Sequence, residues 1–399
     1  MNLTEELYIL YRRMKAAASW TVYLACSIFP IKKNKIVFSA FEGGGYGCNP
    51  KYIAEEIIRR SKLSGKNFEL IWLVNDPTKK FPPEIKPVKN NLLNRAYHLS
   101  TAKIWVDNAR KNFGTRKREG QFYMHTWHGV GVKPIGKMRG KSFSKIASIV
   151  SQYDASLQDC FLCDSKFAFD IFRKAFFNEP LIKIGAPRCD ILVNDVEFQR
   201  KYIREKLNLP QDTKLLMYAP TFRGGSQSKV RNIFQEQSSL DFNLLKCSLE
   251  KKFGGNWRFL LRLHPQLGLR HNLFNISDNF KNFCIDITFE DDLYQFLAAV
   301  DVFLTDYSTA SLEAAILKIP VFLFVDDYDS YIKERGNLIL NISDYPFTFA
   351  KNNQQLQEII LNFDENLYFN KLNSFFNDGE FLIDGHASSR AVDLIENNL

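Results

Sequence analysis

One stretch of this sequence predicts both a part of the fold and a candidate site: His-Thr-Trp-His-Gly-Val-Gly-Val-Lys-Pro-Ile-Gly-Lys-Met, residues 125–138. It follows the apolar residues 122–124, which predict a buried strand, and its glycines and proline are typical of a loop. Loops that follow strands in α/β proteins often hold ligands, histidine can move a proton near neutral pH, and lysine suits phosphate. A core histidine at a strand end, followed by an ordinary turn, has the same pattern, and the spacing alone leaves both interpretations open.

Short apolar runs alternate with amphipathic stretches on both sides of this loop. The expected strands include 36–41, 68–74, 104–107, 122–126, 215–219, 257–263, 302–304 and 321–325. Amphipathic spacing predicts helices between them, for example over 50–61 and 311–317. Strands separated by helices indicate βαβ units and parallel sheets, and the alternation restarts after Asp190. We therefore expect two doubly wound α/β domains facing a cleft, residues 34–190 and 191–399, with the last helix packing back on the first domain.

Polar clusters follow several of the expected strands. They are His125–Lys133, Pro220–Arg223, Arg262–His264 and Asp306–Thr309. Ligands bind beyond the carboxyl ends of parallel strands, so the clusters predict one active site between the domains. A helix that opens after residues 305–309 can hold phosphate at its N–H groups, although a plain helix cap is an equally good explanation. Glu313, one turn further, is placed to reach a ribose hydroxyl or a capping partner.

The N-terminal residues 1–33 combine an almost uncharged run (16–30) with basic flanks. A bilayer span needs about twenty apolar residues, and this run is shorter. We expect a helix that lies on an anionic membrane surface, with a buried N-terminal helix as the alternative. The basic segment 110–118 is expected to be a solvated loop.

Composition narrows the class of protein. The chain has 399 residues, a net charge of +9 and a pI near 9.0, which favours an acidic partner such as phosphate-rich substrates, anionic membranes or nucleic acid. Seven scattered cysteines and six histidines do not have the spacing of a zinc site. The sequence has no P-loop, no GxGxxG after a strand and no HExxH, so we expect neither a metal nor a cofactor.

Several short motifs together resemble the CDP-glycerol glycerophosphotransferase family, which includes teichoic acid primases and polymerases. The matching pieces are Asn49–Ile53, Thr126–Gly129 with Lys133 and Gly136, Gly185–Asp190, Tyr218–Arg223, Arg262–Pro265, Thr305–Thr309, Glu334–Gly336 and Asp384–Gly385. Each motif is weak, but they follow the family's order from about residue 36 to residue 390.

The resemblance implies a GT-B-like fold of two Rossmann-type domains and a peripheral, monotopic attachment to the cytoplasmic face of the cell membrane. The implied reaction transfers a polyol phosphate from CDP-glycerol or CDP-ribitol to a hydroxyl of a lipid-linked glycan and releases CMP, in teichoic acid or capsule-type polymer synthesis. His128 matches the family's proposed base, and His264 matches the histidine proposed to contact the donor phosphates. The remaining donor-binding positions map onto Trp127, Gly129, Val130, Gly131, Arg188, Pro220, Thr221, Arg262, Leu263, Ser308, Thr309 and Glu313.

The chain departs from the family pattern in four places. Val130-Gly131 stands where the family usually has Thr-Pro, Thr309 replaces a serine, and Glu313 replaces an aspartate. Residues 337–349 replace an acidic, Gly-Pro-containing stretch. The changes at Thr309 and Glu313 keep the chemistry, and the replaced stretch leaves open whether the donor carries glycerol, ribitol or another polyol.

Two other classes of function stay open at this point. A nucleotide-sugar glycosyltransferase would share the fold and the phosphate site, but the acceptor would attack carbon instead of phosphorus. A non-catalytic basic module would bind a membrane or nucleic acid, although no nucleic-acid-binding motif is present, and we expect no nucleic acid partner. The sequence does not decide the acceptor, priming against polymerisation, or whether the chain forms a homo-oligomer.

Overall fold

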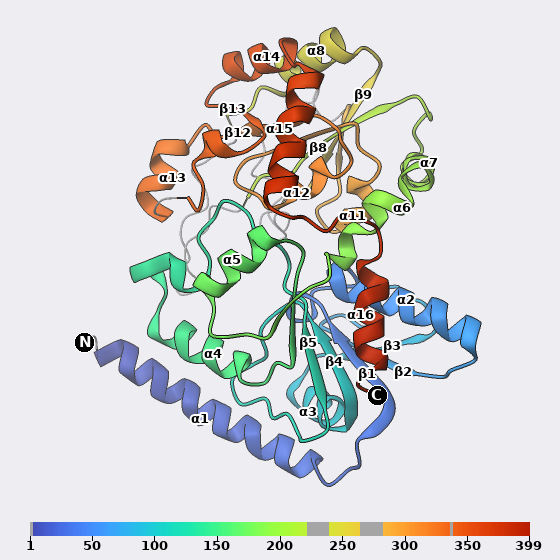
Figure 1. Cartoon of the computed structure of the whole chain (residues 1–399), viewed down its shortest axis with the longest axis vertical. Coiled ribbons are helices and arrows are strands. Elements are labelled where there is room, and N and C mark those ends of the chain that lie inside the picture. Colours follow the sequence, from blue (N-terminus) through green and yellow to red (C-terminus); the bar gives the residue numbers. More distant parts are fainter. Residues whose placement is uncertain (1–2, 222–238, 264–281, 336–337) are drawn as a thin grey trace. The chain divides into compact units, whose positions relative to one another are not determined.

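The computed structural model of the chain describes residues 3–221, 239–263, 282–335 and 338–399 (Figure 1). They form two compact units, each with its own parallel sheet. Unit 1 comprises residues 1–128, 135–190 and 380–399, and unit 2 comprises residues 129–134 and 191–379. The prediction of two parallel α/β domains is confirmed.

Unit 1 contains a seven-stranded sheet in the order β3-β2-β1-β4-β5-β6-β7. Its strands are β1 (Lys32–Ser39), β2 (Glu69–Val74), β3 (Ile85–Lys89), β4 (Ala102–Asp107), β5 (Phe122–His125), β6 (Cys160–Cys163) and β7 (Leu181–Lys183). All neighbouring strands are parallel. The order reverses between β1 and β4, and the loops that follow these strands frame the place where doubly wound sheets bind ligands.

Helices cover both faces of this sheet, which is why its strands are continuous apolar runs. The helices are α1 (Leu3–Cys26), α2 (Cys48–Ser64), α3 (Leu92–Thr101), α4 (Lys145–Ala155), α5 (Lys166–Ala175) and α16 (Ala387–Glu396), with short 3-10 turns at 41–43, 136–142 and 187–189. Successive residues of β1 enter different cores: Ile36 and Phe38 pack with α2, and Val37 packs with Tyr23 of α1. Asparagine or serine side chains accept the first N–H groups of α3, α4 and α5, so local sequence sets where these helices begin.

Helix α1 packs on unit 1 through a narrow stripe and leaves the rest of its surface exposed. Ile9, Ala16 and Tyr23 are buried at a spacing of seven residues. Helix α1 lies against α3, and Glu6 pairs with Lys145 of α4 (3.0 Å; Figure 1). The helix is therefore part of the domain, and its other face carries the large apolar side chains discussed below.

The segment 110–118 is not the solvated loop that its charge predicted. A Cβ on Gly114 would lie 2.4 Å from the backbone oxygen of Ala16, so only glycine allows this approach to α1. Lys111 is buried and pairs with Asp107 (2.6 Å), and Arg118 donates to the carbonyl oxygen of Phe29 (2.7 Å). The positive charges of Lys111 and Arg118 hold the end of β4 and the segment after α1, which a local run of basic residues does not reveal.

The C-terminal residues 380–399 return to unit 1, where α16 lies beside α2 (Figure 1). Arg60 of α2 donates to Asp393 (2.6 Å) and Glu396 (2.9 Å) of α16. The carboxylate of Asp190 accepts the backbone N–H groups of Ala387 and Ser388 at the start of the same helix. These bonds tie the last helix to the segment that ends the middle part of unit 1.

Unit 2 contains a six-stranded sheet in the order β10-β9-β8-β11-β12-β13. Its strands are β8 (Lys214–Tyr218), β9 (Trp257–Leu261), β10 (Cys284–Asp286), β11 (Val302–Thr305), β12 (Val321–Phe324) and β13 (Thr348–Ala350). Its helices are α6 (Ile191–Asn194), α7 (Val196–Lys206), α8 (Phe242–Phe253), α11 (Leu293–Leu297), α12 (Ala310–Ala315), α13 (Tyr328–Arg335), α14 (Asn353–Leu361) and α15 (Glu365–Asp378), with a 3-10 turn at 342–344. The strand order reverses between β8 and β11, as it does between β1 and β4 in unit 1.

Candidate active site

The two histidines of the loop after β5 have different environments. His125, the last residue of β5, is fully buried, and its ring stacks on Phe161 with 4.8 Å between the centroids. Its Nδ1 accepts a hydrogen bond from the backbone N–H of Trp127 (3.2 Å). Burial lowers the pKa of His125 well below its usual value. His125 is therefore a neutral core histidine that fixes the turn leading to His128.

His128 has the geometry of a proton acceptor. Its Nδ1 lies 2.8 Å from the backbone oxygen of Asn108, and because a carbonyl only accepts, Nδ1 carries the proton and Nε2 is the basic nitrogen. The ring stacks on Trp127 (4.4 Å between centroids), so protein surrounds it closely although the residue keeps an exposed surface. This desolvation, together with the positive charges of Arg188 and Arg110, lowers the pKa of His128 to about 4, against the opposing effect of the hydrogen bond to Asn108. The imidazole is neutral at pH 7.

A buried asparagine holds the His128 loop to the turn that carries Arg188. The amide nitrogen of Asn49 donates to the backbone oxygens of Thr126 and Trp127 (3.1 Å each). Its amide oxygen accepts from the backbone N–H of Arg188 (3.0 Å). Arg188 is itself buried. Three of the predicted site residues, Trp127, His128 and Arg188, are thus brought together within unit 1.

A second asparagine spans the strand reversal of unit 1. The side-chain oxygen of Asn108, which follows β4, accepts from the backbone N–H of Phe41, which follows β1 (2.7 Å). Sequence reasoning did not assign a role to Asn49 or Asn108. Asn49 stands in a family motif, but its bonds reach residues 77 and 139 positions away, so no local pattern shows what it does.

In unit 2, Asp306 joins the loops that follow β8 and β11. Its carboxylate accepts from the backbone N–H and the hydroxyl of Thr221 (3.0 Å each) and from the N–H of Tyr307 (2.6 Å). Thr305 donates through its hydroxyl to the oxygen of Ala219 (2.6 Å). Pro220 and Thr221 therefore lie next to the Thr305–Thr309 turn, as their places after neighbouring strands predicted.

The turn after β11 opens α12. The hydroxyl of Ser308 accepts the backbone N–H of Ala310 (3.3 Å), and Thr309 occupies the first position before the helix. Glu313 is buried in α12 and accepts a hydrogen bond from the hydroxyl of Tyr294 in α11 (2.7 Å). Tyr294 carries no recognisable motif, and its role appears only when α11 and α12 pack together.

Arg262 and Leu263 follow β9. Arg262 donates from Nη1 to the backbone oxygens of Ile287 and Thr288 (2.6 and 3.1 Å), which fixes the loop after β10. The N–H of Leu263 donates to the hydroxyl of Thr288 (3.1 Å). His264, predicted to contact the donor phosphates, lies outside the described residues.

Residues 129–134 belong to unit 2, although the peptide bond before Gly129 joins them to His128. Gly131 approaches Thr309 so closely that a Cβ at position 131 would lie 2.9 Å from the Thr309 methyl carbon. The backbone oxygen of Val132 accepts from the N–H of Ile339 (2.7 Å), and Val130 is buried. The loop that begins one residue after His128 is thus held against the Thr305–Thr309 turn.

Three known proteins show what this chain is similar to. It is 31% identical to the teichoic acid poly(glycerol phosphate) polymerase of Staphylococcus epidermidis over 92% of its length, and it spans about half (51%) of that relative. It is 25% identical to the protein of the same name from Bacillus spizizenii, with 98% of this chain and 99% of the relative covered. The solved structure of the wall teichoic acid polymerase TagF superposes with a TM-score of 0.80 at 28% identity, covering 98% of each chain.

The two units are therefore GT-B-like in the sense of the TagF structure. Residues 21–397 match the family described as CDP-glycerol:poly(glycerophosphate) glycerophosphotransferase. This match covers nearly the whole chain and agrees with the ordered motifs. The chain belongs to the CDP-glycerol:poly(glycerophosphate) glycerophosphotransferase family.

Proposed function

We propose that this chain transfers glycerol phosphate from CDP-glycerol to a hydroxyl acceptor and releases CMP, in the synthesis of a teichoic-acid-type polymer. Family membership supports the reaction class. The single observation that supports the proposed reaction is the geometry of His128. Its imidazole is neutral, and its Nδ1–H donates to a backbone carbonyl, so that Nε2 is available as a base. That arrangement suits removal of a proton from an attacking hydroxyl.

The proposed step balances without a further reactant. Nε2 of His128 takes the proton of the acceptor hydroxyl, and the oxygen forms a bond to the phosphorus of the glycerol phosphate. The bond from that phosphorus to the bridging oxygen breaks, and CMP leaves with the electron pair. Arg188, whose positive charge acts on His128, is proposed to stabilise the negative charge that develops.

The donor phosphates are proposed to bind at the strand reversal of unit 2. Pro220–Thr221 and Ser308–Thr309 follow neighbouring strands there, and Asp306 fixes the two segments to each other. Arg262, Leu263 and Glu313 are proposed to shape the same region through their neighbours Thr288 and Tyr294. Glycerol is favoured as the polyol because the two relatives above are named for glycerol phosphate. Ribitol is the second candidate, because a Bacillus spizizenii relative named a poly(ribitol-phosphate) polymerase is 27% identical.

The assay that tests this proposal measures nucleotide release by the purified chain. CDP-glycerol, CDP-ribitol and a UDP-sugar would each be supplied with a lipid-linked acceptor analogue, with His128→Ala alongside. We expect CMP from one CDP-polyol and its loss in the variant. Release of UDP from the sugar donor, or CMP release that is unchanged in His128→Ala, would contradict the proposal.

We also propose that the acceptor is a membrane lipid-linked glycan and that the chain lies on the cytoplasmic face of the membrane through α1. Among the helices of the described residues, none is long and apolar enough to cross a bilayer. The exposed face of α1 carries Leu7, Tyr8, Leu10, Tyr11 and Met14, each at least 47% exposed, beside the basic Arg13 and Lys15. A helix of this composition suits insertion into the headgroup region of anionic lipids.

Co-sedimentation with vesicles of anionic phospholipid tests the membrane contact. The double variant Leu10→Glu, Met14→Glu is expected to stay in the supernatant, because both side chains are exposed and would place charge in the interface. Leu63→Glu is the matched control, because Leu63 is 76% exposed but lies at the end of α2. If both variants sedimented with the vesicles as the wild-type chain does, α1 would not be the membrane contact.

A further inference from the structure

Arg110 lies against the aromatic side chains next to His128, and its guanidinium has no anionic partner. The residue follows β4 in unit 1 and is partly buried. Its Cζ lies 5.7 Å from the ring centre of Trp127 and 5.7 Å from that of Phe176. Among the described residues, none forms an ion pair with this guanidinium or accepts a hydrogen bond from it. Its donors therefore remain available to a ligand.

The charges near Arg110 do not give it a counter-ion. Burial lowers the pKa of Arg110, and the negative charges of Asp154 and Glu179 oppose this effect without pairing with it. The positive charge of Arg139 lowers the same pKa further. Asp154 is engaged elsewhere, because its carboxylate accepts the backbone N–H of Lys111 (2.8 Å). A cation that is partly removed from water without an ion pair is unfavourable, so an anionic ligand would stabilise it.

Two further cations of unit 1, Lys137 and Arg139, lie near Arg110. Both are exposed in a 3-10 turn, and neither forms an ion pair in the described part of the chain. The charges of Lys137 and Arg110 both act on Glu179, and that of Arg139 acts on Arg110. The charge of Arg110 also reaches His128. These cations therefore extend from the proposed base to exposed residues of the same unit.

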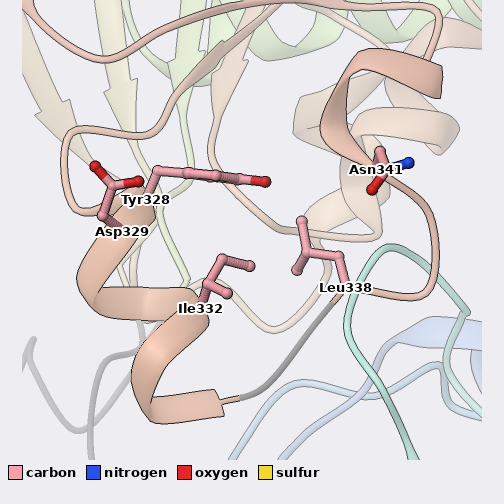
Figure 2. A pocket seen from close by; sticks show the side chains of 5 residues that line it. All are labelled: Tyr328, Asp329, Ile332, Leu338 and Asn341. Carbon is pink, nitrogen blue, oxygen red and sulfur yellow. The ribbon is translucent and has the colours of Figure 1, made fainter.

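The pocket of unit 2 that Figure 2 shows lacks these properties. Its volume is about 410 Å³, and it is lined by Tyr328, Asp329, Ile332, Leu338 and Asn341. These lining residues include one carboxylate and no cation, and the carboxylate of Asp329 already pairs with Lys351 (3.5 Å). The argument for an anionic ligand therefore applies to the surroundings of Arg110 and not to this pocket.

We propose that Arg110, together with Lys137 and Arg139, binds a phosphate of an acceptor that already carries glycerol phosphate, next to the hydroxyl from which His128 takes the proton. A planar guanidinium can stack on aromatic rings and still donate two parallel hydrogen bonds to a phosphate from its edge. The phosphate is assigned to the acceptor because the donor phosphates are proposed to bind in unit 2. A poly(glycerol phosphate) chain, the polymer for which two relatives are named, carries a negative charge on every unit. The inference rests on the proposed function and adds the residues that hold the acceptor.

Calorimetric titration of the full chain with a synthetic glycerol phosphate trimer, and separately with CDP-glycerol, tests the proposal without turnover. Arg110→Met removes the charge and keeps an unbranched side chain against the two rings. We expect it to weaken trimer binding by about tenfold or more, and to leave CDP-glycerol binding unchanged. Arg110→Lys keeps the charge and should retain part of the affinity. Arg116→Met is the matched control, because Arg116 belongs to the same segment and lies 5.0 Å from the ring centre of Trp20 in α1.

Steady-state kinetics separate binding of the acceptor from a displaced base. Arg110→Met is expected to raise the KM for the acceptor by a similar factor and to change kcat much less. A purely structural role of Arg110, acting through Trp127 on His128, would instead lower kcat at saturating acceptor and leave trimer binding as it is.

Unchanged trimer affinity in Arg110→Met would overturn the proposal, and so would a wild-type chain that does not bind the trimer. Two other results would also overturn it: weaker binding of CDP-glycerol alone, which would assign Arg110 to the donor, and weaker sedimentation with anionic vesicles alone, which would assign it to a lipid surface. If Arg110→Met does not fold, Arg139→Ala gives the same comparison, because Arg139 is exposed, with an expected loss of about threefold. A wild-type chain that binds the trimer but releases no CMP would refute the proposed function and leave the phosphate subsite standing.

Discussion

The two strand reversals have the same architecture, but the side chain that joins their loops is neutral in unit 1 and negatively charged in unit 2. In unit 1 the residue after β4 is Asn108, and in unit 2 the residue after β11 is Asp306. Each accepts a backbone N–H from the loop after the neighbouring strand, Phe41 in one case and Thr221 in the other. The equivalent position is thus occupied by a neutral amide, Asn108, in unit 1 and by a carboxylate, Asp306, in unit 2.

The difference fits the work proposed for each unit. A carboxylate at position 108 would stabilise the protonated form of His128, which bonds to the backbone of the same residue. The neutral amide leaves the imidazole under the influence of Arg188 and Arg110, which favour the basic form. In unit 2 the proposed reaction moves no proton, and the Asp306 carboxylate, which accepts three hydrogen bonds, can rigidify the turn. In the proposed reaction, the same scaffold would therefore supply a base in unit 1 and a fixed phosphate-binding turn in unit 2.

The largest expected effect comes from removing the base. In His128→Gln we expect kcat to fall by about 10²–10⁴, the usual range for loss of a general base, with an unchanged melting temperature. His125→Gln is the contrasting variant. Because His125 is fully buried, this substitution should lower the melting temperature. Steady-state kinetics and thermal melts of both variants measure this. If His125→Gln alone abolished turnover in a stable protein, the roles of the two histidines would have to be exchanged.

The next effect concerns the carboxylate of unit 2. Asp306→Ala leaves the partly buried N–H of Thr221 without its acceptor, which costs about 1 kcal/mol in the free energy of unfolding and should raise the KM for the donor. Urea unfolding and donor kinetics provide the two readouts. Asp212→Ala, which removes an exposed carboxylate in the same unit, is the control and should be neutral. A stable Asp306→Ala protein with normal donor KM would mean that the turn holds itself without Asp306.

A smaller effect is expected where residues 129–134 pass the turn after β11 within unit 2. A Cβ in Gly131→Ala would overlap the Thr309 methyl at 2.9 Å, so we expect kcat/KM to fall by about tenfold, equivalent to about 1.4 kcal/mol. Thr309→Ser removes that methyl, and the double variant should recover part of the loss. Equal losses from Gly131→Ala in the two backgrounds would show that the two residues do not share this space.

The smallest effect at neutral pH, and the sharpest test of the asparagine–aspartate contrast, is Asn108→Asp. Because the pKa of His128 is lowered to about 4, wild-type kcat/KM should stay level from pH 7 to pH 5 and fall only as His128 gains its proton. The new carboxylate raises the pKa of His128 by about one unit or more, so the acid limb moves to higher pH. Activity at pH 5 then drops while activity at pH 7.5 changes little. Circular dichroism at pH 5 verifies that the fold persists, and an acid limb of wild type near pH 6.5 would contradict the assignment.

Sequence patterns predicted the parts of this site that depend on local order. Apolar runs located the strands, and the polar residues after them did lie at the carboxyl ends, as Thr221 and Ser308 show. Strand ends were less accurate: β1 begins at Lys32, four residues before the expected start, because lysine and asparagine form its exposed first part.

The residues that sequence reasoning missed act over long distances in the chain. Asn49 and Asn108 each connect two segments, and one polar residue looks like any other until its partner is known. Asp306 was named only as part of a polar cluster, and its bonds to Thr221 appear only in the structure. The same reason explains the wrong expectation for the segment 110–118, whose partner is α1. Helix α1 has a buried stripe, as the interpretation as a helix of the domain predicted, and its contact with a membrane stays a prediction.

The return of residues 380–399 to unit 1 has a consequence for synthesis on the ribosome. The core beside α2 needs Ala391, Val392 and Ile395 of α16, which are translated only after every strand of unit 2. While unit 2 is translated and folds, the nascent unit 1 lacks α16 and exposes an apolar surface. Chaperones bind incompletely folded domains of this kind. The last helix to leave the exit tunnel therefore acts as the closing step of the first domain, so that the unit that carries His128 is completed only in chains whose second unit has been fully translated.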